Sequence, residues 1–447
     1  MYEACVKHQT VNIRQISKDR AEQIANYRFL GNENVTLSEL TKSISEHCQQ
    51  QVSGLHVLAI SDTSEINLEN HRGRLKEQGL GLVGNNQDVG FFIHPTLALN
   101  AETGFPLGLS AVQIWTRAMD HADKKARKYK QLPIEEKESY KWLASAEKSI
   151  YSLDGGDARM VTHIGDRESD LYEEWATVPK RQNHHLLIRA CQNRCLWNEP
   201  ELLYEYLAKQ PLEGTYSLKV QGDKRTGRRT REAFLAVRFV PVDIQRPASL
   251  NAADYPTHLR IYAVEVREIQ PPKDQEPILW RLLTTHEVMS LEKALQIVQW
   301  YCWRWRIEQL FATIKLAGLD IESSQLESPD AIKKLTVIAL SVAVRTLQMV
   351  EGRESPQLSA SLAFSDEQLQ CLSDIEPTLQ GNTEKQQNPH PRLSLPWATW
   401  IIARLGGWSG YRSQRPPGMP TITRGLQRFE AVFIGWILPI SRLVCTR

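Results

Sequence analysis

Two apolar segments, each leading to an aspartate within two residues, place the strongest constraint on how this chain folds. Residues 55–60 (LHVLAI) lead to Asp62, and residues 158–165 (ARMVTHIG) lead to Asp166. Short apolar runs of this kind are typical of strands that are buried on both faces of a sheet. Three more runs have strand character: residues 90–100 (GFFIHPTLALN), 106–115 (PLGLSAVQIW) and 186–190 (LLIRA).

The order of these runs indicates the fold class. Three strands that can form a meander come first, followed by a charge-rich helical pattern over residues 122–150, a strand, a helix and a further strand. An alternation of strands and helices after an initial meander predicts an α/β fold with a mixed sheet.

Residues 301–315 (YCWRWRIEQLFATIK) predict an amphipathic helix with an unusual polar stripe. At 3.6 residues per turn, Tyr301, Arg304, Glu308 and Lys315 fall within roughly 60° of one another, opposite an apolar back. An arginine four residues before a glutamate is usually a solvated surface pair. A tyrosine and a lysine on the same stripe suggest that Glu308 belongs to a site.

Asp62, Asp166 and Glu308 are candidate ligands for divalent cations. Each aspartate comes where an apolar strand gives way to a loop, and neighbouring strand ends bring such side chains together. Three close carboxylates repel one another unless they hold hard cations, and two Mg²⁺ or Mn²⁺ ions held in this way can promote phosphodiester cleavage. The alternative is that both aspartates only cap the loops that follow.

Composition excludes several classes of protein. With 447 residues, of which 41% are hydrophobic, the chain can bury a sizeable core, and a net charge of +2 requires any polyanion to bind at local patches. Seven cysteines without a CxxC pair indicate a reducing compartment and no disulfide framework. A zinc site would have to use residues whose spacing matches no common ligand pattern: His184, His185, Cys191 and Cys195.

The sequence also predicts a cytoplasmic protein. Its first residues (MYEACVKHQTVNIRQ) lack the apolar stretch of a signal peptide. The longest apolar runs, residues 335–344 and 431–440, are too short to span a bilayer.

The region after the fifth strand changes character. Three runs alternate with a period of two and predict antiparallel strands, and a strongly basic turn, residues 222–231 (GDKRTGRRTR), joins the first two. Such a turn is usually a solvated loop, although beside a DNA site it would suit backbone phosphates. The three runs are residues 215–220 (TYSLKV), 231–242 (REAFLAVRFVPV) and 258–269 (HLRIYAVEVREI).

The motifs ISDTS, HIGDRESD and Y-x2-R-x3-E-x6-K with WRWRIEQ resemble those of DDE transposases of bacterial insertion sequences, in the group marked by the YREK pattern. The resemblance extends along most of the chain, through ANYRFLGNENV, EKESYKWLA, PILWRLLTT and WIIARLGGW. It implies an RNase H-like core whose metal ligands are Asp62, Asp166 and Glu308. The implied divisions are an N-terminal helical segment (1–52), the core (53–190 and 283–350), a β-rich insertion (191–282), a linker (351–395) and a helical C-terminal region used for dimerisation (396–447).

The resemblance also implies roles for residues around the acids. Tyr301, Arg304 and Lys315 complete the YREK pattern, which grips phosphates of the transposon end, and their donors suit that role. Arg189 is expected to add a phosphate contact. Trp280 corresponds to a tryptophan that stacks on a base flipped out during hairpin formation, although a tryptophan in a strand core is an equal alternative.

The expected activity is metal-dependent excision and strand transfer of an insertion sequence through hydrolysis and transesterification, by way of hairpin ends. Its partners would be double-stranded transposon and target DNA near the nucleoid, and a second copy of the chain in the synaptic complex. About two dozen residues precede ANYRF, and relatives carry a basic segment there. Two alternatives therefore stay open: a shortened, non-catalytic inhibitor that acts by dimerisation, and a metal-dependent DNA endonuclease.

Overall fold

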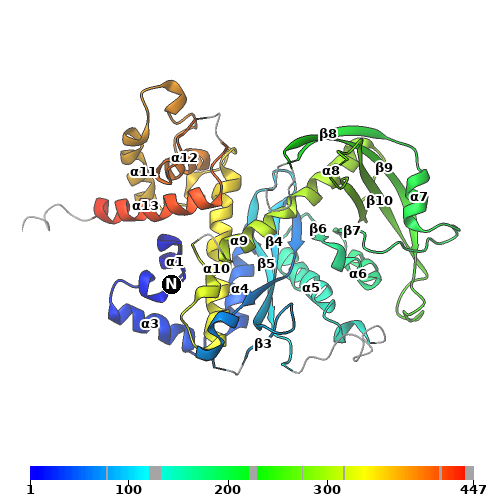
Figure 1. The fold of residues 1–447 in the computed structure, drawn as a ribbon, viewed down its shortest axis with the longest axis horizontal. Helices are drawn as coiled ribbons and strands as arrows, with labels where there is room; N and C mark the ends of the chain where they lie inside the picture. Colours follow the sequence, from blue (N-terminus) through cyan, green and yellow to red (C-terminus); the bar gives the residue numbers. More distant parts are fainter. Residues whose placement is uncertain are drawn as a thin grey trace, which may run out of the picture.

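The computed structural model describes residues 1–76, 79–119, 132–220, 229–273, 275–315, 318–411 and 415–437. A mixed sheet runs through the molecule, with helical layers on its faces and a helical bundle at one side (Figure 1). The α/β class expected from the sequence is confirmed. The helices outside the site are α1 (Tyr2–His8), α2 (Ile13–Ile16), α3 (Arg20–Gly31), α4 (Leu37–Gln49), α5 (Tyr140–Gly155), α6 (Tyr172–Thr177), α7 (Leu203–Lys209), α11 (Asp366–Leu379), α12 (Leu395–Leu405) and α13 (Met419–Ile437).

The sheet has eleven strands in the order β2-β4-β1-β6-β7-β11-β10-β9-β8, while β3 and β5 also pair with β4. The pairs β1–β6 and β6–β7 are parallel, and the other pairs are antiparallel. The strands are β1 (His56–Ser61), β2 (Ser64–Asn67), β3 (Gly81–Leu82), β4 (Val89–Asn100), β5 (Pro106–Trp115), β6 (Met160–Gly165), β7 (His184–Arg189), β8 (Gly214–Val220), β9 (Arg231–Gln245), β10 (His258–Ile269) and β11 (Leu279–Thr284).

The central strands are buried on both faces, which explains why they read as continuous apolar runs. Along β1, Leu58 and Ile60 belong to the large core that includes residues of α8 (Leu291–Trp303), α9 (Trp305–Lys315) and α10 (Pro329–Gly352). Val57 and Ala59 face the other way, into a smaller core with residues of α4 and α5. Alternate residues of one strand therefore hold both helical layers on the sheet.

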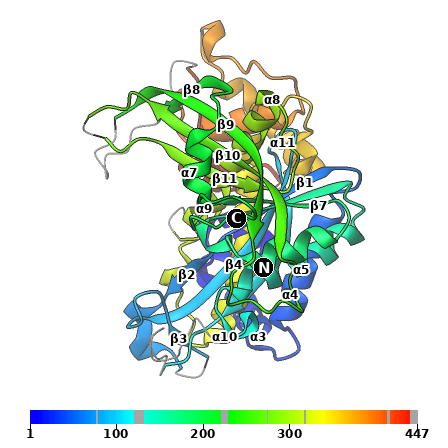
Figure 2. The ribbon, with the colours of Figure 1, turned by 90° about the vertical axis from the view of Figure 1, so that its right-hand side faces the viewer.

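The strands β8 to β11 extend the same sheet. β11 pairs with β7, with Leu282 opposite Arg189, so the extension is joined to the core by backbone hydrogen bonds. Figure 2, turned so that the right-hand side of Figure 1 faces the viewer, shows α7 against the strands of this extension. The predicted strands at 215–220, 231–242 and 258–269 correspond to β8, β9 and β10, whereas most of the basic turn at 222–231 lies outside the described residues.

Two predicted helices differ from the structure. The helix expected over residues 122–150 begins only at Tyr140, as α5, and residues 120–131 lie outside the described part. The run at 301–315 is not one helix: α8 (Leu291–Trp303) and α9 (Trp305–Lys315) are separate, with Arg304 in a turn between them. Tyr301, near the end of α8, is buried rather than exposed.

The long buried helix expected after the acidic helix is α10 (Pro329–Gly352). The Ser328 side chain accepts from the Ala331 N–H and Pro329 stands at the first turn, a common way to begin a helix. At 24 residues, α10 is long and apolar enough to cross a bilayer, although the apolar run at 335–344 within it is too short to do so. Of the apolar 18-residue stretch of α10, 78% is buried inside the protein. No other helix in the described ranges meets both criteria.

The region expected to be a linker, residues 351–395, is instead part of a folded bundle. It contains α11, and its Phe364, Leu369 and Leu372 are buried in a second core together with residues of α12 and α13. Turns and two 3₁₀ helices, Ala360–Leu362 and Glu384–Gln386, flank α11 and interrupt the helical pattern of the sequence on both sides.

Candidate active site

The carboxyl ends of β1 and β6 bring Asp62 and Asp166 to one edge of the sheet. Asp62 directly follows Ser61, the last residue of β1, and Asp166 directly follows Gly165, the last residue of β6. The two strands are parallel neighbours, with Ile60 opposite Ile164. Strands paired in this way end at the same edge. Asp166 is close enough to raise the pKa of Asp62.

Arg304 links this edge to the third acid. Its Nη1 lies 2.6 Å from Asp62 Oδ2 and its Nη2 lies 3.0 Å from Glu308 Oε1. The turn between α8 and α9 places Arg304 where it reaches both carboxylates. Burial opposes the charge on Arg304, but its neighbours raise its pKa above the ordinary value, Tyr301 most, followed by Asp62, Glu308 and Asp166. Arg304 therefore lies among all three acids.

Asp62 is held in a partly desolvated position. Its side chain is 17% exposed, and its Oδ1 accepts from the Thr63 N–H at 2.8 Å. The Thr63 hydroxyl in turn lies 2.8 Å from His94 Nδ1 on β4. Burial raises the pKa of Asp62 to about 6, helped by Asp166 and opposed by Arg304 and the Thr63 N–H. A buried carboxylate of this kind favours a nearby cation.

Asp166 also has a local role. Its Oδ1 accepts from the Glu168 N–H at 2.8 Å and caps the single turn Arg167–Ser169. The alternative that the strand-end aspartates act as caps is thus realised at Asp166, and it does not conflict with a further role because capping uses one oxygen.

Tyr301 lies near Arg304 and has Arg189 as a neighbour. Burial raises the pKa of Tyr301, and a hydrogen bond with the Arg189 side chain acts in the opposite direction. Arg189 is the last residue of β7 and also donates to the Leu279 carbonyl at 3.3 Å. The Arg304 guanidinium carbon lies 6.0 Å from the centre of the Tyr301 ring. The structure thus brings four predicted residues around Arg304, namely Asp62, Asp166, Tyr301 and Glu308. A fifth, Arg189, lies next to Tyr301.

Two predicted site residues are placed differently. Lys315 lies two turns beyond Glu308, about 10 Å along α9, and its Nζ is 3.3 Å from Glu322 Oε1. Trp280 stands opposite Val266 in the sheet and is half-buried against the large core. Its surroundings match the alternative of a tryptophan in a strand core.

The donor set suits hard divalent cations, since carboxylate oxygens are the ligands that Mg²⁺ and Mn²⁺ prefer. The arrangement of the acids does not form a closed cage: within the described residues, no three His, Cys, Asp or Glu side chains are grouped for metal binding. The guanidinium of Arg304 occupies the space between Asp62 and Glu308. Those two carboxylates could hold a cation only after Arg304 moves.

The histidines considered for zinc have other partners. His184 lies 2.8 Å from Asp154 Oδ1 and 3.0 Å from His163 Nε2, on buried strands. Cys191 and Cys195 are both exposed. The structure gives this group no metal geometry.

Sequence reasoning missed the supporting residues of the site. Thr63 adjoins Asp62 and could have been noticed, but His94 is brought in by the pairing of β1 with β4. The direct contact of Arg304 with Asp62 joins positions far apart in the chain, and only the Arg304–Glu308 spacing was visible in the sequence.

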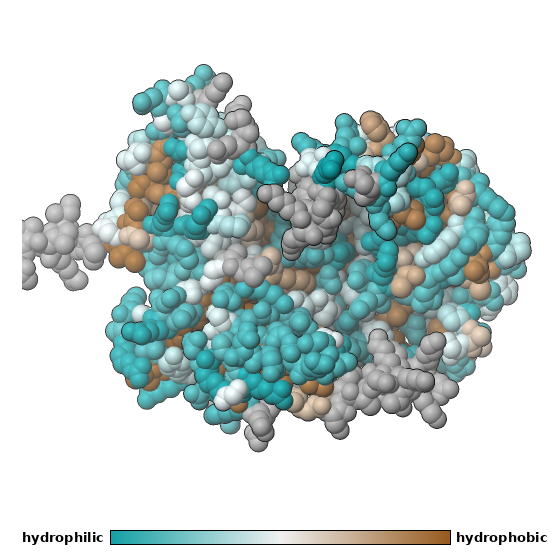
Figure 3. Space-filling view, viewed as in Figure 1, coloured by the Kyte–Doolittle hydropathy of each residue, from teal (hydrophilic) through white to brown (hydrophobic). Residues whose placement is uncertain are grey.

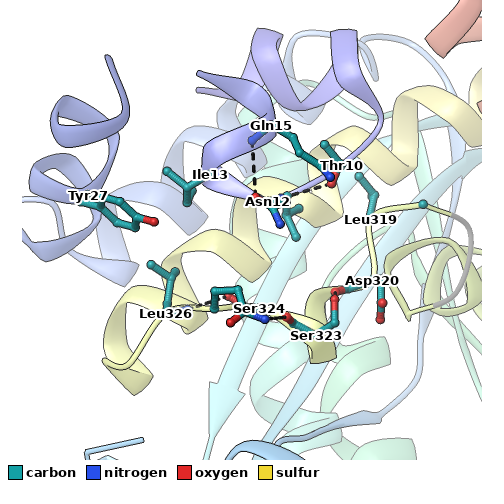
Figure 4. Close-up of a pocket in the computed structure, with 13 residues that line it drawn as sticks. Thr10, Asn12, Ile13, Gln15, Tyr27, Leu319, Asp320, Ser323, Ser324 and Leu326 are labelled. Carbon is teal, nitrogen blue, oxygen red and sulfur yellow. Dashed lines mark hydrogen bonds between the residues drawn. The ribbon is translucent and has the colours of Figure 1, made fainter. Parts of the chain in front are cut away.

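A separate polar pocket of about 230 Å³ lies between the N-terminal segment and the loop after α9 (Figure 4). Its lining includes Asn12, Tyr27 and Asp320. The Asn12 carboxamide already accepts from the N–H groups of Arg14 and Gln15. None of the three acids lines this pocket.

No protein-family model matches the chain.

Proposed function

We propose that the chain is a DDE-type transposase that cleaves and joins DNA at the edge marked by Asp62, Asp166 and Glu308. The observation that carries this proposal is that Asp62 and Asp166 follow the ends of adjacent parallel strands, while Arg304 joins Asp62 to Glu308. Asp62 follows β1 and Asp166 follows β6, its parallel neighbour, while Glu308 lies on α9. Because each acid is attached to a regular element, the three have little freedom to separate.

The topology supports an RNase H-like core, as the resemblance implies. Strands β5, β4, β1, β6 and β7 lie in that order, β1, β6 and β7 are mutually parallel, and β4 is antiparallel to β1. The sheet extension between Asp166 and Glu308 occupies the position of the β-rich insertion.

Two Mg²⁺ or Mn²⁺ ions bound to the carboxylates would activate water or a 3′-hydroxyl and stabilise the leaving oxygen. The chain's own groups orient the DNA. Arg304 and Arg189 present guanidinium donors that match phosphate oxygens, and Tyr301 adds a hydroxyl next to Arg189. DNA that takes over the donors of Arg304 would free Asp62 and Glu308.

The test is incubation of the full chain with a duplex that carries the repeats flanking its coding sequence, in Mg²⁺ or Mn²⁺. Hairpinned ends and joined products support the transposase. Cleavage without hairpins or joining would instead support the endonuclease alternative, and an intact duplex under both metals would refute the proposal.

A further inference from the structure

One buried carboxylate in the sheet extension gathers three arginines. Glu265 on β10 is fully buried. In the sheet register it stands between Arg238 on β9 and Arg281 on β11. Arg267 lies two residues further along β10 and therefore on the same face. The distances from Glu265 oxygens are 2.9 Å to Arg281 Nε, 3.4 Å to Arg238 Nη1 and 3.6 Å to Arg267 Nε.

Glu265 is paired with more arginines than its single negative charge requires. A single carboxylate is satisfied by one well-placed arginine, as in two other pairs of the extension, Arg231 with Glu268 at 2.7 Å and Arg260 with Asp243 at 2.6 Å. Three arginines on Glu265 leave two positive charges in excess. Each guanidinium has five N–H donors, far more than the oxygens of one glutamate can accept.

Two of the guanidinium groups are held by further contacts, and all three arginine side chains are partly exposed. The Arg238 Nε donates to the Gln210 carbonyl at 3.0 Å, and the Arg281 guanidinium carbon lies 3.9 Å from the centre of the Tyr204 ring. The exposed fractions of the side chains are 24% for Arg238, 19% for Arg281 and 48% for Arg267. Guanidinium groups held in this way lose little conformational freedom when they bind an anion.

One acid lies near the group without neutralising it. Glu205 on α7 is close enough for Arg281 to lower its pKa, but the largest cause of that lowering is its hydrogen bond from the Asn193 side chain. The Asn193 amide lies 3.0 and 2.9 Å from the two Glu205 oxygens. One excess positive charge therefore remains even when Glu205 is counted.

The group lies next to the edge that carries the acids. The Ala190 N–H, one residue beyond the end of β7, donates to the Arg281 carbonyl at 2.8 Å. Arg167, which follows Asp166, is close enough to Tyr204 to act on its pKa. Arg281 and Arg167 thus both act on Tyr204, and the nearby acid Asp170 is already paired with Arg194.

We propose that Arg238, Arg267 and Arg281 form a second phosphate-binding site, which holds the backbone of the DNA where it passes from the acidic edge onto the sheet extension. The proposal rests on the proposed function for the identity of the polyanion. Guanidinium forks suit phosphodiester oxygens, and contacts of this kind carry no sequence preference.

The test uses the full chain, a fluorescein-labelled 40-base-pair duplex of random sequence, and anisotropy titrations in EDTA at several KCl concentrations. Arg267→Ala leaves Glu265 paired with Arg238 and Arg281. The plot of log K against log salt has a negative slope, and this variant should make it less steep by about 0.9. Arg238→Ala combined with Arg267→Ala should lower the slope by about twice as much while keeping Arg281 on Glu265.

Arg260→Ala is the matched control, because Arg260 is 60% exposed and lies on the same strand with its side chain on the other face. Its slope should stay at the wild-type value, and melting curves should show that all variants are folded. If Arg267→Ala and the double variant match Arg260→Ala, the site is refuted even if the wild type cleaves DNA. A reduced slope in a protein that never cleaves DNA refutes the proposed function and supports the site, and a wild type that binds no duplex refutes both.

Discussion

Arg304 donates to both Asp62 and Glu308, so its removal leaves a partly buried carboxylate without its cation. Arg304→Gln should destabilise the protein by roughly 1–3 kcal/mol at pH 8, because Asp62 is then ionised without a partner. The pKa of Asp62 is already raised to about 6, and loss of Arg304 raises it further. The penalty should therefore shrink as the pH falls to 4, where Asp62 is protonated.

This prediction is checked by thermal melts of a double-variant cycle with Asp62→Asn. The neutral amide at position 62 does not need the arginine, so Arg304→Gln should cost less in that background. Equal costs in both backgrounds would mean that the Arg304–Asp62 contact contributes nothing to stability.

Glu174 on α6 is a second residue whose charge matters. It is 3% exposed, the Ser169 hydroxyl donates to it at 2.7 Å, and burial raises its pKa to about 8. A carboxyl whose pKa is raised by folding makes the protein less stable as the pH rises through the interval between the unfolded and folded values. Glu174→Gln should remove this cost and stabilise the protein by roughly 3 kcal/mol at pH 7.

The measurement is the free energy of unfolding between pH 4 and pH 8. The advantage of Glu174→Gln should be largest at the alkaline end and close to zero at pH 4. Glu276→Gln, in an exposed loop, is the control and should show no such trend. An advantage that does not change with pH would exclude ionisation as its cause.

At the scale of elements, the sequence predicted strands better than the helix that carries Glu308. The runs that became β1, β4, β6 and β7 are apolar because both faces are buried, and that requirement is local and visible. The turn at Arg304 is not encoded by a glycine or proline. The helical wheel, which placed Tyr301 and Lys315 on one stripe with Glu308, carries no information on what packs over that stripe. In the structure Tyr301 is buried and Lys315 pairs with Glu322.

The packing of α12 against α13 depends on the absence of a side chain at Gly425. A Cβ atom there would lie 1.9 Å from the Ile402 carbonyl oxygen. Gly425→Ala should force the helices apart and destabilise the C-terminal bundle by roughly 1–3 kcal/mol. At Gly435 on the same helix a Cβ would meet nothing within 4 Å. Gly435→Ala should therefore stabilise the helix by up to about 1 kcal/mol.

Chemical denaturation of the two variants beside the wild type checks this pair. Opposite signs are expected from the same substitution on one helix. If Gly425→Ala were neutral or stabilising, the close approach of α12 and α13 would be contradicted.

At the scale of the whole molecule, the features that could not be predicted from the sequence are those that depend on contacts between residues distant in the chain. The alternation of strands and helices predicted the α/β class, and the strand-end aspartates predicted that Asp62 and Asp166 meet. The junction of β11 with β7 and the burial of residues 351–395 in the C-terminal bundle depend on partners distant in the chain. The contact of Arg304 with Asp62 is of the same kind.

The C-terminal bundle leaves apolar surface uncovered. On α13, Val432, Ile434, Trp436 and Ile437 are each 38–50% exposed. Apolar surface gathers where α13 lies at the left of Figure 3. The dimer expected from the resemblance would bury such a face. It stays a prediction, which a measurement of the molecular mass in solution would test.

The most direct test of the account is DNA cleavage by three isosteric variants, Asp62→Asn, Asp166→Asn and Glu308→Gln. Each keeps the shape of the side chain and removes the charge that the proposed chemistry needs. In Mg²⁺, on a duplex that carries the flanking repeats, each should lower the cleavage rate by roughly 100-fold or more. Asp254→Asn, in an exposed loop of the extension, should cleave like the wild type. A folded variant of any of the three acids that cleaves at the rate of Asp254→Asn would contradict the central claim.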